Sequence, residues 1–233
     1  MTSQMSPSLG VLSLESCGQE ALPPELPGSM MNPATYGIPI ISETVVGAWA
    51  EVVIAGDATL EPACIAAARR LVERGAAAIT SNCGFFIRHQ PAVAAAVNVP
   101  VAMSSLLLIP TLLRQLPRAA KLAVLTADST CCSDDLLGLD DPAQRSRIVI
   151  AGIEGTKYWH DAMLRPLPPI DVPAIERDVA ACVARLRAQH PEIAAILFEC
   201  TAFPLVAKSI RDMTELPVYD ITSLCLLVIP PIA

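Results

Sequence analysis

The stretch Ser-Asn-Cys-Gly-Phe at residues 81–85 is the part of the sequence from which the fold is most readily inferred. It follows an apolar run at 76–80, which is typical of a buried strand. A segment with helical periodicity at 60–74 comes before that run, and Gly75 separates the two. This order of helix, glycine, strand and polar turn is typical of α/β proteins. It therefore predicts that Cys83 lies at the carboxyl edge of a parallel sheet.

The same order of elements returns in the second half of the chain. The stretch Ile-Leu-Phe-Glu-Cys-Thr at 196–201 again ends an apolar run with a cysteine. A Pro-Val pair begins 17 residues after each cysteine, at Pro100 after Cys83 and at Pro217 after Cys200. Equal spacing between two anchors indicates an internal duplication. We therefore expect two similar halves, each with one cysteine at an equivalent turn.

Strands that alternate with helices predict an α/β fold with a parallel sheet in each half. The boundaries expected from the repeat are 1–105 for the first lobe, 106–222 for the second, and 223–233 for a return to the first. The strands are predicted at 9–14, 51–57, 76–80, 100–103, 121–126, 147–152 and 194–198. Helices are predicted at 60–74, 90–97, 106–116 and 175–189. Two proline-rich segments, 15–39 and 155–173, are predicted to be irregular, and whether 15–39 acts as a lid is left open.

Composition excludes several classes of protein. Apolar residues make up 53% of the 233 residues, which is enough for a large core. The net charge of −7 and the lack of a basic stripe argue against a nucleic-acid partner. The most apolar window, 93–113, is interrupted by Asn98, Pro100 and Pro110, so no membrane span is expected. Without a recognisable signal peptide, the sequence predicts a cytoplasmic protein.

Eight cysteines are present, but none forms a C-x-x-C pair. A zinc site is therefore poorly supported, and disulfides are not expected in a cytoplasmic protein. The adjacent Cys131 and Cys132 are better explained as residues at the start of a helix than as a metal site. Most of the thiols are expected to be small buried apolar groups. The sequence thus predicts neither a metal nor another cofactor.

Two thiols at equivalent turns suggest acid–base chemistry. A thiolate is a usable base when its surroundings are polar. If one thiolate removes a proton from a carbon atom and a thiol on the other side returns one, the configuration is inverted without metal or pyridoxal. A pair of buried structural cysteines is the alternative, and the matched positions of Cys83 and Cys200 favour catalysis.

On the stretches 81–85 and 198–201, the chain resembles the aspartate/glutamate racemase superfamily, which also contains hydantoin racemases, maleate isomerases and arylmalonate decarboxylases. The resemblance implies a cofactor-independent enzyme of two α/β lobes with the active site in the cleft between them. It implies that Cys83 and Cys200 are the catalytic acid–base pair, that the substrate is a small carboxylate, and that the chain forms a homodimer. The substrate-binding residues that it implies are Asn82, Gly84, Phe85, Thr126 and Thr201.

The expected function is a cofactor-independent racemase or epimerase of a small amino acid or related carboxylate. Glutamate is not favoured, because Gly84-Phe85 and Thr201-Ala202 differ from the residues that follow the cysteines in glutamate racemases. The alternatives are a lyase, such as a decarboxylase, or a cis–trans isomerase on the same scaffold, and a non-catalytic carboxylate-binding protein. Whether Glu199 polarises Cys200 or is only a residue at the end of a strand is left open.

Overall fold

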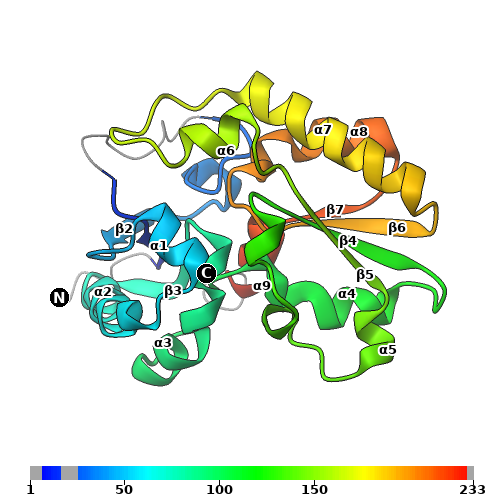
Figure 1. The fold of residues 1–233 in the computed structure, drawn as a ribbon. Helices are drawn as coiled ribbons and strands as arrows, with labels where there is room; N and C mark the ends of the chain where they lie inside the picture. Colours follow the sequence, from blue (N-terminus) through cyan, green and yellow to red (C-terminus); the bar gives the residue numbers. More distant parts are fainter. Residues whose placement is uncertain (1–6, 17–25, 230–233) are drawn as a thin grey trace.

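A computed structural model describes residues 7–16 and 26–229. Two separate parallel sheets organise them, one of three strands in the order β2-β1-β3 and one of four in the order β5-β4-β6-β7 (Figure 1). The α/β fold with two lobes is therefore confirmed. The strands are β1 (Ser8–Ser13), β2 (Ile40–Thr44), β3 (Ala76–Ser81), β4 (Lys121–Thr126), β5 (Ile148–Gly152), β6 (Ile193–Phe198) and β7 (Val218–Tyr219).

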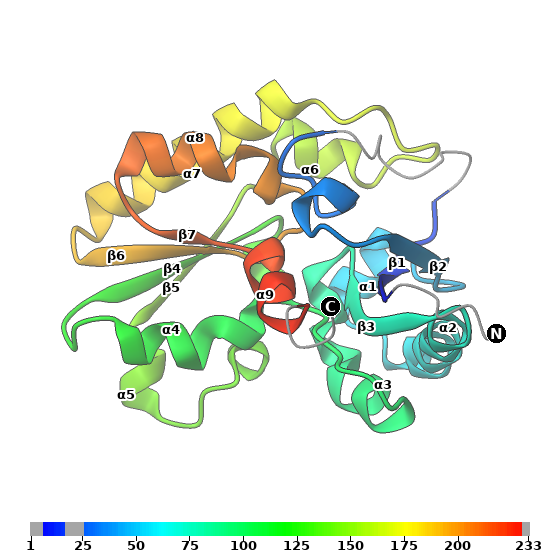
Figure 2. The same ribbon diagram turned by 180° about the vertical axis from the view of Figure 1, so that it is seen from behind.

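Helices pack against both sheets, and Figure 2 shows the same two-lobed arrangement from behind. The first lobe carries α1 (Ala50–Ala55), α2 (Glu61–Glu73) and α3 (Gln90–Ala96). The second part of the chain adds α4 (Ile109–Gln115), α5 (Pro142–Arg145), α6 (Lys157–Asp161), α7 (Val172–Gln189), α8 (Ala207–Thr214) and α9 (Ile221–Val228). Local sequence explains the long helix α7: Asp171 accepts a hydrogen bond from the Ala174 N–H as its N-cap, and Pro173 stands in the first turn.

The strand pairing of the two lobes has the same hydrogen-bond register. The pairing of β1 with β3 shifts by one residue after Ser8, and that of β4 with β6 shifts equivalently after Lys121. The bridge from Ile79 to Val101 in the first lobe corresponds to the pairing of Ile196 with Val218 in the second. The first lobe therefore has a single bridge where a strand at 100–103 was predicted.

One predicted strand is wrong. Residues 51–57 form helix α1 and the turn that ends it, at Gly56 with a φ of 80°. The second strand of the first sheet is β2, which begins directly after the predicted irregular segment 15–39. A short apolar run such as Val-Val-Ile does not by itself distinguish a strand from a buried helix.

Two further segments connect the lobes. The described part of the 15–39 segment contacts the second lobe, because a Cβ on Gly28 would lie 2.9 Å from the Pro204 carbonyl oxygen. Residues 17–25, which include Cys17, lie outside the described residues. Helix α9 lies between the two sheets in both views (Figures 1 and 2), and its Ile221 and Leu224 belong to the core that also contains strand β1. The lobe boundaries themselves stay a prediction.

Within residues 7–16 and 26–229, no helix combines the length and apolar content that crossing a bilayer requires.

Candidate active site

Each cysteine predicted from sequence to be catalytic stands at a sharp turn after a strand that pairs with the first strand of its lobe, β3 with β1 and β6 with β4. We define the first corner as residues 82–86, after β3, and the second corner as residues 199–203, after β6. The Asn82 N–H donates to the Leu12 carbonyl oxygen at 3.0 Å, and the Glu199 N–H donates to that of Leu125 at 2.7 Å. Glu199 is therefore the counterpart of Asn82 in the repeat, and Cys200 is the counterpart of Cys83.

The two corners face each other across the junction of the lobes. The Thr201 hydroxyl of the second corner donates directly to the Asn82 carbonyl oxygen of the first. Nearby, the Ser105 hydroxyl donates to the Phe198 carbonyl oxygen at 2.7 Å. The structure thus brings the two cysteines into one site, close enough for the charge of Cys200 to raise the pKa of Cys83.

Burial raises the pKa of the two thiols, whereas backbone hydrogen-bond donors lower it. Burial raises the pKa of Cys83 well above its usual value, and burial raises that of Cys200 to about 12. The negative charge of Glu199 adds to both shifts. In each corner, two backbone N–H groups facing the sulfur lower the pKa, because they stabilise a thiolate. These donors belong to Phe85 and Phe86 in the first corner and to Ala202 and Phe203 in the second.

Tyr158 breaks the symmetry of the pair. Its hydroxyl lies 3.6 Å from Cys200 Sγ, and this hydrogen bond lowers the pKa of Cys200. Burial and the charge of Cys200 raise the pKa of Tyr158 well above its usual value, so the phenol keeps its proton and can donate it to a Cys200 thiolate. No corresponding side-chain donor acts on Cys83 among the described residues. Cys200 is therefore the better supported thiolate of the two.

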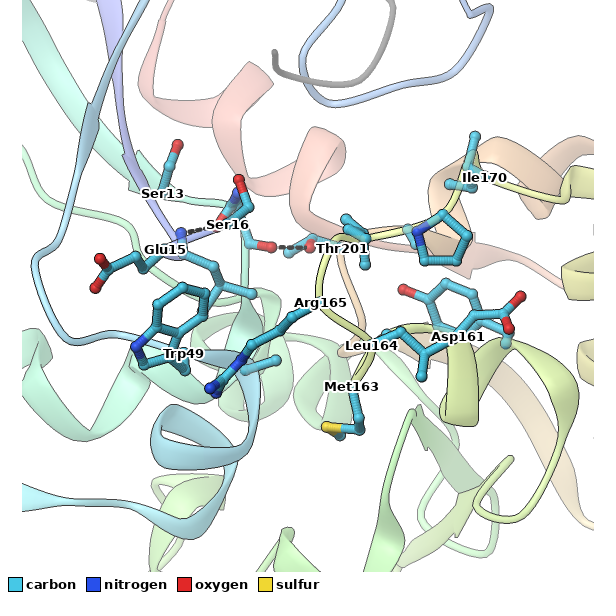
Figure 3. Close-up of a pocket in the computed structure, with 18 of the residues that line it drawn as sticks. Ser13, Glu15, Ser16, Trp49, Asp161, Met163, Leu164, Arg165, Ile170 and Thr201 are labelled. Carbon is cyan, nitrogen blue, oxygen red and sulfur yellow. Dashed lines mark hydrogen bonds between the residues drawn. The ribbon is translucent and has the colours of Figure 1, made fainter. Parts of the chain in front are cut away.

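A cavity of about 300 Å³ opens over the corners. Both lobes line it, with Ser13 and Trp49 on one side and the segment around Met163 on the other (Figure 3). The residues next to the cysteines form its floor: Asn82, Tyr158, Thr201 and Ala202. The cysteines themselves are only partly exposed and do not line the cavity, so they lie just behind this floor.

The cavity wall carries more negative than positive charge. Its described lining residues include one cation, Arg165, against four carboxylates, Glu15, Glu51, Asp161 and Asp171. The Arg165 guanidinium pairs with Glu51 and stacks 4.0 Å above the Trp49 ring, which it approaches in Figure 3 from the opposite lobe. Because Arg165 is already engaged, the cavity is a poor site for a ligand with several negative charges.

The implied substrate-binding residues are placed in two groups. Asn82 and Thr201 line the cavity, whereas Gly84, Phe85 and Thr126 are buried outside its lining. The Asn82 Oδ1 atom accepts from the Leu14 N–H at 2.8 Å, and the Nδ2 group, which has no hydrogen-bond partner among the described residues, can donate to a ligand. The roles of these five residues in substrate binding stay a prediction.

Three contributors to the site were not assigned from sequence: the Tyr158 phenol, the Arg165 guanidinium and the buried charge of Glu199. Tyr158 and Arg165 lie in the irregular segment 155–173, and aromatic residues in a long loop are the only signal that could have indicated them. In the part of the chain that the structure describes, no group of three His, Cys, Asp or Glu side chains is placed to hold a metal ion.

Solved structures with this architecture include racemases and a decarboxylase. Allantoin racemase from Pseudomonas fluorescens superposes with a TM-score of 0.62 at 16% identity, over 96% of this chain and 89% of that one. Unliganded arylmalonate decarboxylase gives a TM-score of 0.54 at 15% identity, over 97% and 92%. The chain has the aspartate/glutamate racemase fold. The resemblance found in the sequence is therefore confirmed at the level of the fold.

Similarity in sequence leads to a different activity from the one expected. No family model matches the chain. A dimethylsulfoniopropionate lyase of Durusdinium sp. clade D is 30% identical over 84% of this chain and 66% of its own length. Dimethylsulfoniopropionate lyase 7 of Emiliania huxleyi (strain CCMP1516) is 29% identical over 94% and 65%. The chain thus spans just under two thirds of the length of these relatives.

The racemase prediction is contradicted by these relatives, which are named as lyases and not as isomerases. The alternative of a lyase on the same scaffold agrees better with them. An enzyme on a racemase-like fold is supported, and the isomerase class is not.

Proposed function

We propose that this chain is a lyase that cleaves the carbon–sulfur bond of dimethylsulfoniopropionate. The observation that carries the proposal is the sequence similarity to lyases named for this substrate, over 84% and 94% of the chain. The geometry of the corners supports it, because a thiol with backbone and phenol donors is suited to remove a proton.

The reaction is a β-elimination. A thiolate takes a proton from C2, the carbon next to the carboxylate, and forms an S–H bond. The C2–H electron pair becomes the C2=C3 double bond, and the C3–S bond breaks with its electron pair on sulfur. The products are acrylate, neutral dimethyl sulfide and a protonated thiol, which returns its proton to solvent.

Only one base is needed for this reaction, and Cys200 is the better candidate. Dimethyl sulfide leaves as a neutral molecule and needs no proton, so the second thiol has no obligatory acid role. Cys200 has the Tyr158 hydroxyl in addition to two backbone N–H groups, whereas Cys83 has the backbone donors alone. We therefore assign Cys200 as the base and Cys83 as its neighbour across the reacting carbon.

The charge of the cavity suits a substrate with a cationic sulfonium group. Carboxylates outnumber cations in the lining, although Glu51 is paired with Arg165 and both Asp161 and Asp171 lie near Lys157, so Glu15 is the lining carboxylate without a cation partner among the described residues. The Tyr158 ring adds an aromatic face, on which a cation can bind. The Nδ2 group of Asn82 is the donor we assign to the substrate carboxylate. A dianionic malonate would meet the same carboxylates, which is why we prefer this substrate to that of a decarboxylase.

The purified chain is expected to convert dimethylsulfoniopropionate to dimethyl sulfide and acrylate in equal amounts. Headspace gas chromatography measures the sulfide, and proton NMR in D₂O measures the acrylate. The same NMR experiment shows whether unreacted substrate gains deuterium at C2, which reports reversible proton removal. Absence of sulfide above a boiled-enzyme blank, at substrate concentrations up to several millimolar, would rule the proposal out.

The Tyr158→Phe variant is expected to lower kcat/KM about tenfold near neutral pH, the effect of losing a hydrogen bond to a charged group. The phenol lowers the pKa of Cys200, so its removal raises that pKa. The thiolate is the active form, and the rising limb of the pH–rate profile should therefore move to higher pH. The measurement is kcat/KM between pH 6.5 and 10.

Tyr219→Phe is the matched control, because it removes a phenol that lies in β7 and has no hydrogen-bond partner among the described residues. It should leave the profile in place. A Tyr158→Phe variant with a higher KM and an unmoved pH limb would mean that the phenol binds substrate and does not act on the thiol.

A further inference from the structure

Glu199 is a buried carboxylic acid at a position where the first half of the chain has a neutral amide, Asn82. Its side chain is 1% exposed. One carboxyl oxygen, Oε2, accepts from the Thr126 hydroxyl at 2.7 Å, and the other, Oε1, is buried without a hydrogen-bond partner among the described residues. Its counterpart Asn82 shows that this position in the fold does not require a charge. An unpaired oxygen in such a place is costly, so it calls for a functional explanation.

The Glu199 carboxyl group reaches from the second corner to the first. Gly84, which follows Cys83, leaves the space that this group fills: a Cβ on Gly84 would collide with Oε1 and with the Glu199 carbonyl oxygen. Glu199 also precedes Cys200 directly in sequence. The carboxyl group therefore lies between the two corners, beside both cysteines and behind the cavity floor.

The action of Glu199 on the thiols is electrostatic. The structure shows no hydrogen bond from either cysteine sulfur to the carboxyl group among the described residues. Its charge nevertheless raises the pKa of Cys83 and of Cys200, second only to burial in both cases. Burial raises the pKa of Glu199 itself to about 7, against the opposing effects of the Thr126 hydroxyl and the Arg88 charge.

The surroundings of Glu199 do not neutralise it. Arg88 is the cation that acts on it, but one Arg88 nitrogen donates to the Cys131 carbonyl oxygen at 2.9 Å and another faces Asp135 at 3.9 Å. The charged and titratable groups that face Glu199, from both lobes and from α6, are Cys83, Arg88, Cys132, Tyr158 and Cys200.

We propose that Glu199 is a positioning residue whose buried charge acts on both cysteines at once and holds them as thiols in the free enzyme. For catalysis, and resting here on the proposed lyase function, the expected consequence is that each cysteine becomes a stronger base once its thiolate forms. A thiolate formed beside a carboxylate binds a proton more tightly and is better able to remove one from a weakly acidic carbon. Glycine at position 84 leaves the space that the Glu199 carboxyl group occupies.

The test is thiol alkylation of the complete chain without substrate. Iodoacetamide is used between pH 6 and 9.5, and peptide mass spectrometry gives separate rates for Cys83 and Cys200. In Glu199→Gln, which keeps the shape and loses the charge, we expect both cysteines to react on the order of tenfold faster at pH 8. The rising limb of each rate–pH profile should shift to lower pH. An unmoved limb, or one shifted to higher pH, would overturn the inference.

Glu154→Gln is the matched control, because Glu154 also accepts hydrogen bonds in the second lobe, from Ser129, but does not contribute to the pKa of either thiol. Its alkylation profile should equal that of the unmodified chain. If Glu199→Gln does not fold, Thr126→Val serves instead. Loss of the Thr126 donor raises the pKa of Glu199 further, so the carboxyl group stays neutral to higher pH and both thiols should react faster near pH 7.5.

This experiment distinguishes a failure of the Glu199 inference from a failure of the proposed lyase function. Alkylation needs no substrate, so a chain without lyase activity can still show the effect of Glu199. A chain that releases dimethyl sulfide but has an unchanged alkylation profile in Glu199→Gln keeps its proposed function and loses this inference.

Discussion

Replacing Cys200 by serine is expected to lower the rate of dimethyl sulfide release by about 10³-fold or more, the size of effect seen when a general base is removed. Serine has nearly the same shape as cysteine, but its hydroxyl gives up a proton far less readily. The two backbone N–H groups and the Tyr158 phenol would then face a group that stays neutral. Initial rates with saturating substrate, together with a thermal unfolding curve, measure the loss and exclude misfolding.

The comparison with Cys83→Ser decides between chemistries on this scaffold. An elimination with a neutral leaving group uses one base. The rate of dimethyl sulfide release in the Cys83 variant should therefore fall about tenfold or less, because the substitution changes only the packing and the electrostatics beside Cys200. Cys131→Ser, a partly exposed thiol outside both corners, should be unaffected. Equal and complete losses at Cys83 and Cys200 would contradict the one-base mechanism and mean that both thiols exchange protons with the substrate.

Much of the fold was predictable because the buried strands are apolar runs with clear ends. Strands β3, β4 and β6 lie where the sequence predicts them, and so does α2. Strand β2 was missed because it is only partly buried and follows a long proline-rich segment. Helix α1 was predicted as a strand because its Val-Val-Ile run is apolar and short, and its packing against the first lobe, not its own propensity, makes it a helix.

Only those parts of the site that occur in both halves of the chain could be predicted from the sequence. The duplication indicated Cys83 and Cys200, and the hydrogen bonds of the two corners confirm that these positions are equivalent. What distinguishes the corners lies outside the repeat pattern: Tyr158 comes from a separate helix, and Glu199 differs in charge from its counterpart Asn82. The sequence also could not give the fate of the carbanion. That depends on the leaving group of the ligand, for which the corners carry no signature.

Replacing Gly84 by alanine is expected to lower activity about 100-fold or more while the chain still folds. The added Cβ would collide with both Oε1 and the backbone carbonyl oxygen of Glu199. A side chain can turn away, but the carbonyl belongs to the turn that carries Cys200, so the second corner itself must move. A shift of about 1 Å at a reacting group can cost 10²-fold in rate. Overpacking of this kind costs about 1–3 kcal/mol of stability.

Measurements of kcat/KM and of the unfolding free energy of the Gly84→Ala variant separate these two effects. The double variant Gly84→Ala/Glu199→Ala is the informative partner, because it removes the clash with the carboxyl group and leaves the clash with the carbonyl oxygen. Stability should therefore recover in part, whereas activity should stay low, since the turn that carries Cys200 remains displaced. A single variant with full activity would show that the corners are not in the close contact from which Cys200, Glu199 and the substrate carbon derive their arrangement.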